Sequence, residues 1–203
     1  MNGVLILLAG YPGTGKTFLS NIIKKKLGGL VRISPDDIKE DYFDRYGFRN
    51  IKEKQQIERI AWEKYYEIME KQMKRGNGII SDYPFSSKQK TYLEKLSGNY
   101  NYKVITIRLI ADLDILYERQ QKRDLDPTRH LSHIVNSYKK GDYLTNREKA
   151  DNLLTYEEFI ERFKTRGYNT FNLGRLFEVD VTDYTNVNYT DLIDNVETYL
   201  SLE

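Results

Sequence analysis

The residues best suited to chemistry lie in one stretch near the start of the chain, residues 10–17, which read GYPGTGKT. This stretch matches the phosphate-binding pattern G-x-x-x-x-G-K-[ST] at every fixed position. Its glycines allow successive backbone N–H groups to turn toward phosphate oxygens. Lys16 can reach the outer phosphates, and Thr17 offers a hydroxyl to a magnesium ion. We therefore predict a nucleoside triphosphate site. Its predicted binding residues are Gly10, Tyr11, Pro12, Gly13, Thr14, Gly15, Lys16, Thr17 and Phe18.

Two acids follow the second predicted strand, residues 29–34. Ser34 and Asp37 fit a capping box with Pro35 at the first helical position, so Asp37 is occupied with the helix end. Asp36 is then free at the carboxyl end of a strand, where open α/β sheets bind ligands. Its carboxylate could accept the proton of an attacking hydroxyl. The alternative is that both acids only favour the positive end of the helix.

A third acid, Asp82, ends the predicted strand at residues 78–82. As the second element of a phosphate site, it could hold magnesium through water or position catalytic groups. Asp82 and Thr17 are therefore the predicted metal residues. The alternative is a turn acid before Tyr83 and Pro84.

Basic residues gather in the second half of the chain. Arg119 and Arg123 lie one turn apart on one face of a predicted helix that Asp112 caps. Residues 124–129 break this helix, and we expect another helix over about 128–140. A helix, a basic hinge and a helix are typical of a mobile lid, so residues 119–140 are predicted to close over a triphosphate. Guanidinium groups there could stabilise the phosphoryl group during its transfer. The alternative is that these residues are ordinary surface arginines.

The elements that position these residues follow from the apolar pattern. Residues 4–9 form a continuous apolar run, which predicts a strand buried on both faces, and a helix follows the phosphate loop. Segment 142–175 contains a capping box at 155–158, and its aromatic residues could wall a substrate pocket or pack on the sheet. Further strands are predicted at 103–110 and 176–181, and further helices at 51–75, after Ser86 and after Thr190.

The composition limits the class of protein. The 203 residues carry a net charge of +2 and suit one α/β domain with a proper core. No strong field of one sign indicates nucleic acid or an acidic membrane. The absence of cysteine excludes a thiolate metal site and suits a reducing compartment. The apolar start has no basic leader and runs into the phosphate loop, so we expect a cytoplasmic protein without a membrane span. His130 and His133 have no third ligand nearby, which favours a structural pair over a metal site.

Over residues 4–140 the chain resembles the small phosphate-loop kinases grouped around the polynucleotide 5'-hydroxyl kinases, the chloramphenicol phosphotransferase and the zeta-toxin kinases. The likeness rests on GYPGTGKT, ISPDDIK at 33–39, IISD at 79–82 and ERQQKR at 118–123. It implies a three-layer fold with a five-stranded parallel sheet in the order 2-3-1-4-5 and a helical lid. It also implies that Asp36 is the general base and that Lys39, where the family has arginine, lines the substrate cleft. The lid arginine falls on Arg123, and Arg119 lies one turn earlier.

These observations together predict a kinase that depends on ATP and magnesium and transfers the γ-phosphoryl group to a hydroxyl. Asp36, Lys16 and Arg123 are the predicted catalytic residues, and Arg119 is predicted to bind the nucleotide. The acceptor is a small molecule, which the near-neutral charge slightly favours, or the 5' end of a nucleic acid. The alternative function is a regulatory ATPase that has no phosphoryl acceptor.

Overall fold

The computed structural model describes residues 3–202 and contains one sheet of five parallel strands. The strands are β1 (Val4–Gly10), β2 (Leu30–Arg32), β3 (Gly78–Asp82), β4 (Lys103–Ile110) and β5 (Arg175–Asp180). Their order is β2-β3-β1-β4-β5, which confirms the predicted topology. Leu7 of β1 pairs with Ser81 of β3 and with Thr106 of β4, so β1 lies in the middle of the sheet.

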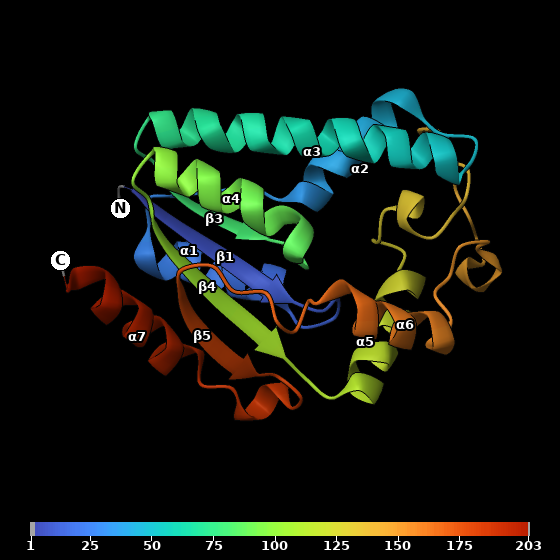
Figure 1. The fold of residues 1–203 in the computed structure, drawn as a ribbon. Helices are drawn as coiled ribbons and strands as arrows, with labels where there is room; N and C mark the ends of the chain where they lie inside the picture. Colours follow the sequence, from blue (N-terminus) through green and yellow to red (C-terminus); the bar gives the residue numbers. More distant parts are fainter. Residues whose placement is uncertain (1–2, 203) are drawn as a thin grey trace.

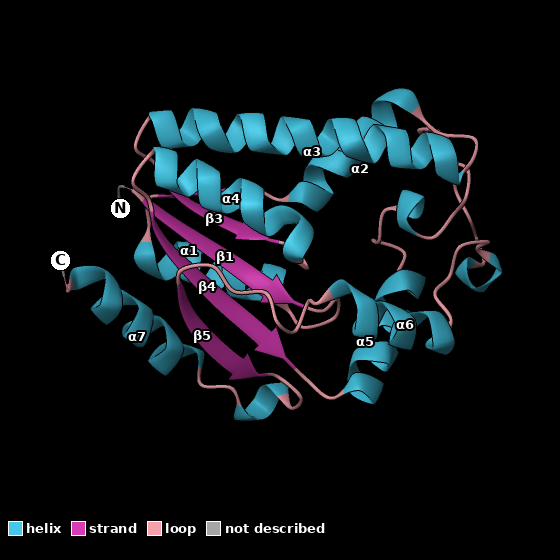
Figure 2. Cartoon of the chain, in the orientation of Figure 1, coloured by secondary structure: helices cyan, strands magenta, loops and turns pink. Residues whose placement is uncertain are grey.

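Helices cover both faces of this sheet, which gives three layers (Figures 1 and 2). The helices α3 and α4 lie on one face, α1 and α7 lie on the other, and α5 and α6 lie beyond the carboxyl ends of the strands. The α-helices are α1 (Lys16–Leu27), α2 (Pro35–Tyr46), α3 (Ile51–Lys74), α4 (Ser87–Asn99), α5 (Leu113–Leu125), α6 (Tyr156–Arg166) and α7 (Tyr189–Ser201). Short 3-10 helices occur at η1 (Leu131–His133), η2 (Arg147–Lys149) and η3 (Tyr184–Asn186).

The central strand explains why the core has two halves. All seven residues of β1 are buried, and alternate side chains point to opposite faces of the sheet. Ile6 and Leu8 pack toward α1 and α7, whereas Leu5 and Leu7 pack toward α3 and α4. A strand of this kind must be apolar throughout, because neither of its faces meets water.

The end of β1 needs a glycine. Gly10 has φ +115°, and a Cβ atom there would lie 2.1 Å from the carbonyl oxygen of Leu109 on β4. Any larger residue would therefore push apart the two central strands where the phosphate loop begins. The parallel strands end at this edge, so the loops that follow β1, β2 and β3 meet on one side of the sheet (Figure 1).

Several local predictions are confirmed. Ser86 and Thr155 each form a full capping box at the start of α4 and α6. Ser34 does precede α2 and Pro35 is its first residue, but the predicted capping box is wrong, because the Ser34 side chain makes no capping hydrogen bond. The last helix is capped by Asn188 rather than by Thr190.

The lid prediction is wrong in its secondary structure. No helix covers residues 128–140; this segment contains only η1 and otherwise irregular backbone. It is held against the loop that follows α2, because Phe48 and Tyr138 exchange two backbone hydrogen bonds of 2.7 Å. None of the helices within residues 3–202 combines the length and the apolar character that a membrane crossing requires.

Candidate active site

Lys16, the lysine of the phosphate loop, is folded back onto its own loop. Its ammonium group donates hydrogen bonds to the carbonyl oxygens of Gly10 (3.0 Å) and Tyr11 (2.5 Å) and to the hydroxyl of Thr14 (3.2 Å). The Thr14 hydroxyl in turn donates to the Tyr11 carbonyl at 2.8 Å. The ammonium group is therefore surrounded by acceptor oxygens of its own loop. Phosphate oxygens are acceptors of the same type.

The charge of Lys16 is finely balanced. Burial is the largest cause that lowers its pKa, and the guanidinium of Arg123 lowers it further. The carboxylates of Asp36 and Asp82 act in the opposite direction, and the resulting pKa is about 7. The side chain thus feels charges from three separate elements, α2, α5 and the end of β3, which all face the phosphate loop.

Thr17 and Asp82 meet as the sequence predicts. The Thr17 hydroxyl donates a hydrogen bond of 2.8 Å to the Asp82 carboxylate, which is almost fully buried. Asp82 is also held by Arg32 of β2, whose Nε lies 2.9 Å from Oδ1 and whose second contact to Oδ2 is 3.1 Å. Arg32 in addition binds Asp37 at 2.6 Å. Asp37 is therefore occupied with Arg32 and not with the end of its helix.

Sequence reasoning missed Arg32. The available signal was a charged residue inside the predicted strand at 29–34, since a charge in a buried strand needs a partner. In the structure that partner is Asp82, which Arg32 contacts through a bidentate pair of hydrogen bonds. This geometry suits the planar guanidinium group.

These residues fit a magnesium ion in one respect. Because the Thr17 hydroxyl gives its hydrogen to Asp82, its oxygen lone pairs are left for a metal. Magnesium commonly takes one or two protein oxygens together with phosphate and water. Within residues 3–202 there is no group of three or more acidic, histidine or cysteine residues that could hold a metal alone. The phosphates of a nucleotide would have to supply part of the coordination.

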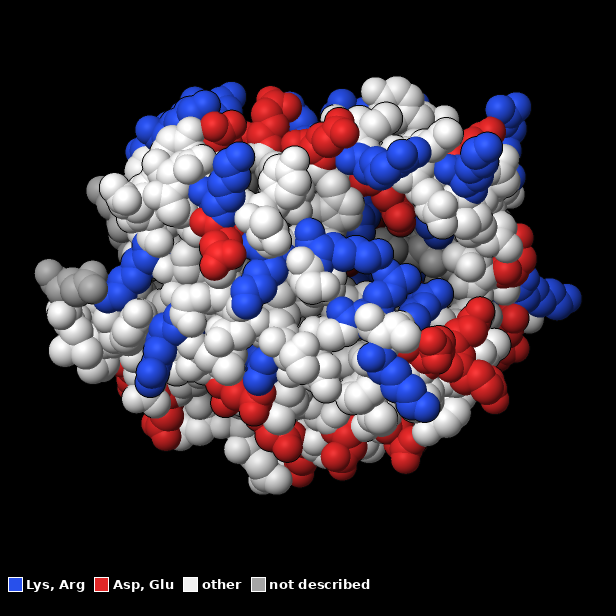
Figure 3. Space-filling view, in the orientation of Figure 1, with Lys and Arg blue, Asp and Glu red and all other residues white. Residues whose placement is uncertain are grey.

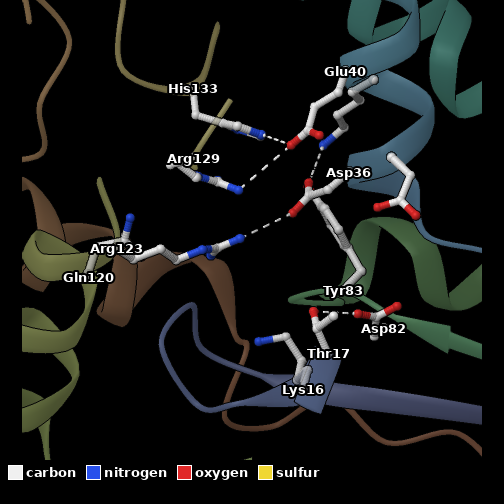
Figure 4. A network of polar contacts seen from close by, with 12 residues as sticks. Lys16, Thr17, Asp36, Glu40, Asp82, Tyr83, Gln120, Arg123, Arg129 and His133 are labelled. Carbon is white, nitrogen blue, oxygen red and sulfur yellow. Dashed lines mark hydrogen bonds and ion pairs between the residues drawn. The ribbon is translucent and has the colours of Figure 1, made fainter. Parts of the chain in front are cut away.

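Asp36 faces the phosphate loop across the cavity (Figure 4). Its carboxylate lies 3.8 Å from the ammonium of Lys39 and 3.9 Å from the guanidinium of Arg123. Burial would raise the pKa of Asp36, but Lys39 and the other nearby cations outweigh burial and lower it to about 2. Both cation contacts are too long for hydrogen bonds. The charged carboxylate therefore keeps acceptor capacity for a hydroxyl group.

Lys39 is held behind Asp36 by aromatic side chains. Its ammonium donates to the Tyr83 hydroxyl at 2.8 Å and lies 4.4 Å from the centre of the Tyr83 ring and 5.3 Å from that of Trp62. The lysine is buried, and although burial opposes its charge, Tyr83 and Asp36 raise its pKa above the ordinary range. Lys39 is thus a fixed positive charge beside the predicted base, and it lines the cavity.

The two arginines of α5 have different surroundings. Arg123 points toward Asp36, as described above. Arg119 instead donates hydrogen bonds of 2.8 Å to the carbonyl oxygens of Val181 and Thr182, and its guanidinium lies 3.9 Å from the centre of the Tyr184 ring. The Tyr184 hydroxyl donates to the Gly13 carbonyl at 2.8 Å. Arg119 and Tyr184 therefore fix the loop after β5 against the phosphate loop.

One cavity of about 650 Å³ joins these groups. Lys16, Asp36 and Arg123 line it, and so does Phe18, whose side chain is otherwise exposed. In Figure 3, lysine and arginine side chains gather around a hollow to the right of the centre, with acidic side chains inside the ring. The structure thus brings together all the predicted catalytic residues.

The irregular segment after α5 closes one side of this cavity. His133 lies 2.6 Å from Glu40 of α2, and Arg129 lies 3.8 Å from the same carboxylate (Figure 4). Burial lowers the pKa of His133, and the contact with Glu40 partly offsets this. His130 contacts Asp44 at 3.1 Å. The two histidines therefore pair with two acids one turn apart on α2 and do not share a site.

Comparisons with known proteins agree with this fold. A family model described as AAA domain matches residues 5–140. A protein of Chloroflexus aurantiacus J-10-fl with a proposed kinase function is 24% identical, over 98% of both chains, with a TM-score of 0.75. The tunicamycin resistance protein of Deinococcus radiodurans is 15% identical, over 99% of this chain and 97% of its own, with a TM-score of 0.55. A gluconokinase from Sinorhizobium meliloti 1021 is 12% identical, over 99% and 98%, with a TM-score of 0.53. The search of curated proteins found no match.

Proposed function

Because this chain belongs to the AAA domain family, we propose that it is a kinase that uses ATP and magnesium to phosphorylate a hydroxyl group. The observation that carries the proposal is the shared cavity: Lys16, Asp36 and Arg123 come from three different elements and face the same space. A phosphate-binding group, a charged carboxylate and a guanidinium are the parts that phosphoryl transfer to an alcohol requires.

The phosphate end of the cavity would hold the nucleotide. The backbone of residues 10–17 and Lys16 would bind the β and γ phosphates once the ammonium turns from its loop carbonyls to phosphate oxygens. Thr17 and Asp82 would hold magnesium, which neutralises charge on the phosphates when bound. Arg119 and Tyr184 would flank the base end of the nucleotide, because they connect the loop after β5 to the phosphate loop.

Asp36 would receive the proton of the acceptor. The acceptor oxygen forms a bond to the γ-phosphorus, and the bond between that phosphorus and the oxygen that bridges to the β-phosphate breaks. ADP leaves with the electron pair. The hydroxyl proton passes to Asp36, whose pKa of about 2 ensures that it is ionised beforehand. So weak a base is sufficient if the proton moves late, as it does in a loose transition state.

Arg123 would stabilise the transferring group. Its guanidinium lies 3.9 Å from Asp36, so a phosphoryl group moving toward an alcohol beside Asp36 passes within its reach. The charge on the three equatorial oxygens would then be met by a cation supplied from α5.

A small molecule is the acceptor class that we favour. Besides the phosphate loop, α2, Tyr83 and residues between 152 and 162 line the cavity, and a concave site of about 650 Å³ suits a compact molecule better than a polymer. The names of two structural neighbours, a gluconokinase and a tunicamycin resistance protein, refer to small organic compounds. A polynucleotide acceptor would instead show binding that weakens steeply with salt.

The test is transfer of labelled γ-phosphate to a panel of alcohols, with Asp36→Asn as the decisive variant. We expect this variant to bind ATP almost normally and to lose roughly 100-fold or more in kcat, as follows the loss of a general base. Asp41→Asn is the matched control, because Asp41 lies on the same helix and is half exposed in a pair with Arg45. Release of phosphate only to water, with no labelled alcohol, would favour a regulatory ATPase instead.

A further inference from the structure

The cavity has a wall that the family model does not cover. The AAA domain match ends at residue 140, yet Asn152, Leu154 and Arg162 line the cavity. The predicted helical segment at 142–175 therefore contributes to the site. One part of this wall, the helix α6, packs directly on Tyr11 of the phosphate loop.

The position of Arg162 is fixed by the helix that carries it. Phe163 of α6 stacks on Tyr11 of the phosphate loop with ring centres 4.8 Å apart, and Phe159 contacts the same tyrosine at 6.0 Å. Residues at positions i, i+3 and i+4 share one face of a helix, so Arg162 lies beside both phenylalanines. The aromatic contact thus fixes α6 on the phosphate loop and directs Arg162 to the rim of the cavity.

Most other cations in the cavity are already engaged. Arg32 binds Asp82, Lys39 and Arg123 flank Asp36, Arg129 contacts Glu40, and Arg119 binds two carbonyl oxygens. Among the described residues, Arg162 and Lys122 line the cavity without an ion pair or a hydrogen bond. Lys122 lies on α5 between Arg119 and Arg123. Arg162 lies on α6 and is close enough to Lys54 of α3 for its positive charge to lower the pKa of that lysine.

The surroundings of Arg162 carry an excess of positive charge. Lys54 of α3 is buried, and burial is the largest cause of its lowered pKa; Glu58 opposes this, and Lys39, Arg129 and Arg162 add to it. The Lys54 ammonium has only a carbonyl oxygen at 3.4 Å and an aromatic ring face nearby. Glu58 lines the cavity and forms no ion pair with any described residue. A single free carboxylate therefore faces several cations.

We propose that Arg162 binds an anionic group, a carboxylate or a phosphate, on the acceptor alcohol, and that Glu58 accepts a hydrogen bond from one of its further hydroxyls. This inference rests on the proposed kinase function and names its substrate class: a hydroxylated anion. An arginine that lines a cavity without a partner gains most from a charged oxygen pair, which its guanidinium can bind with two hydrogen bonds.

The first experiment compares matched acceptors that differ in charge: glucose, gluconate and glucose 6-phosphate, and glycerol, glycerate and glycerol 3-phosphate. We expect the wild-type protein to phosphorylate an anionic member of a set better than its neutral member. Arg162→Ala should raise the KM for that anion by about 10- to 100-fold, with little change in kcat, the size expected for a lost charge-assisted contact. Lys164→Ala, two residues along the same helix and away from the cavity, should leave KM unchanged. A neutral acceptor that is preferred, or equal effects of both variants, overturns the inference.

The second experiment separates this inference from the kinase proposal. With saturating ADP on the phosphate loop, gluconate or glucose 6-phosphate should raise the Tm of the wild-type protein and of Lys164→Ala, and Arg162→Ala should need roughly a 10- to 100-fold higher concentration for the same rise; glucose should raise each Tm less than the anion does. Whether gluconate or glucose 6-phosphate raises the Tm more shows whether the site prefers a carboxylate or a phosphate. Anions that leave the wild-type Tm unchanged, or raise the Tm of Arg162→Ala equally, overturn the inference even if an alcohol is phosphorylated. If the anions bind as expected but no alcohol is labelled, the kinase proposal alone fails.

Discussion

The protonation of Lys16 provides a test of the site by pH. In the free protein burial and Arg123 lower its pKa to about 7, and its ammonium is held only by neutral oxygens. A bound triphosphate would place several negative charges beside it, and these favour the charged form. Nucleotide binding above pH 7 should therefore be accompanied by uptake of a proton.

The magnitude follows from the pKa. At pH 8 a lysine with a pKa of about 7 is about 90% neutral, so binding should take up about 0.9 proton per nucleotide. Above pH 7 the complex holds more protons than the free protein, so affinity must fall as the pH rises. If Lys16 stays charged in the complex, the Kd should increase about 50-fold between pH 7 and pH 9.

The assay is calorimetric titration with a non-hydrolysable ATP analogue in buffers of different ionisation enthalpy. Two variants should shift the result in opposite directions, because Arg123 lowers the pKa of Lys16 and Asp36 raises it. Arg123→Gln should reduce the proton uptake at pH 8, and Asp36→Asn should increase it or extend it to lower pH. Binding enthalpies that do not depend on the buffer, together with a Kd that is constant from pH 7 to pH 9, would refute this account of Lys16.

Two further predictions concern the supports of the site. Arg32→Ala leaves the buried Asp82 carboxylate without its cation, so we expect a loss of about 3 kcal/mol in the free energy of unfolding, measured by urea denaturation; an unchanged midpoint would contradict the role of this pair. The pKa of His133 is lowered from 6.5, chiefly by burial, so the unfolded chain binds more protons below that pH and stability should fall on acidification from pH 7 to pH 5.5. His133→Gln should make this fall shallower, and a fall as steep as that of the wild-type protein would count against it.

The parts of the fold that could be predicted depend on local pattern. Local sequence is enough to predict the seven-residue apolar strand, the glycine loop and the amphipathic helix, because each depends on residues that are neighbours along the chain. The helix start at Ser86 and the capping box at Thr155 are equally local and are confirmed. At Ser34 the same reasoning failed, because Arg32 offered Asp37 a stronger partner than the helix end.

In the site, too, some features could be predicted from the sequence and others could not. The predicted catalytic residues come together because the ends of parallel strands share one edge, and topology alone is enough for that result. Arg32, Tyr184 and Arg162 were not predicted, because their importance depends on partners 50 or more residues away or on a cavity wall. Their roles in binding stay predictions until the variants are measured.

The segment from 128 to 140 was expected to contain a helix, and its contacts with α2 show how it is held without one. His130 and His133 are three residues apart, which suits one face of a helix, and on α2 their partners Asp44 and Glu40 are four apart. Each histidine thus meets a carboxylate on a helix that is already formed, and the backbone of the segment need not be helical to achieve this. The helix α2 supplies the regular spacing, and the segment adapts to it through η1 and the backbone contact of Tyr138 with Phe48. Since Glu40 also contacts Arg129 on the cavity wall, the pairing of this segment with α2 fixes a cation next to Asp36.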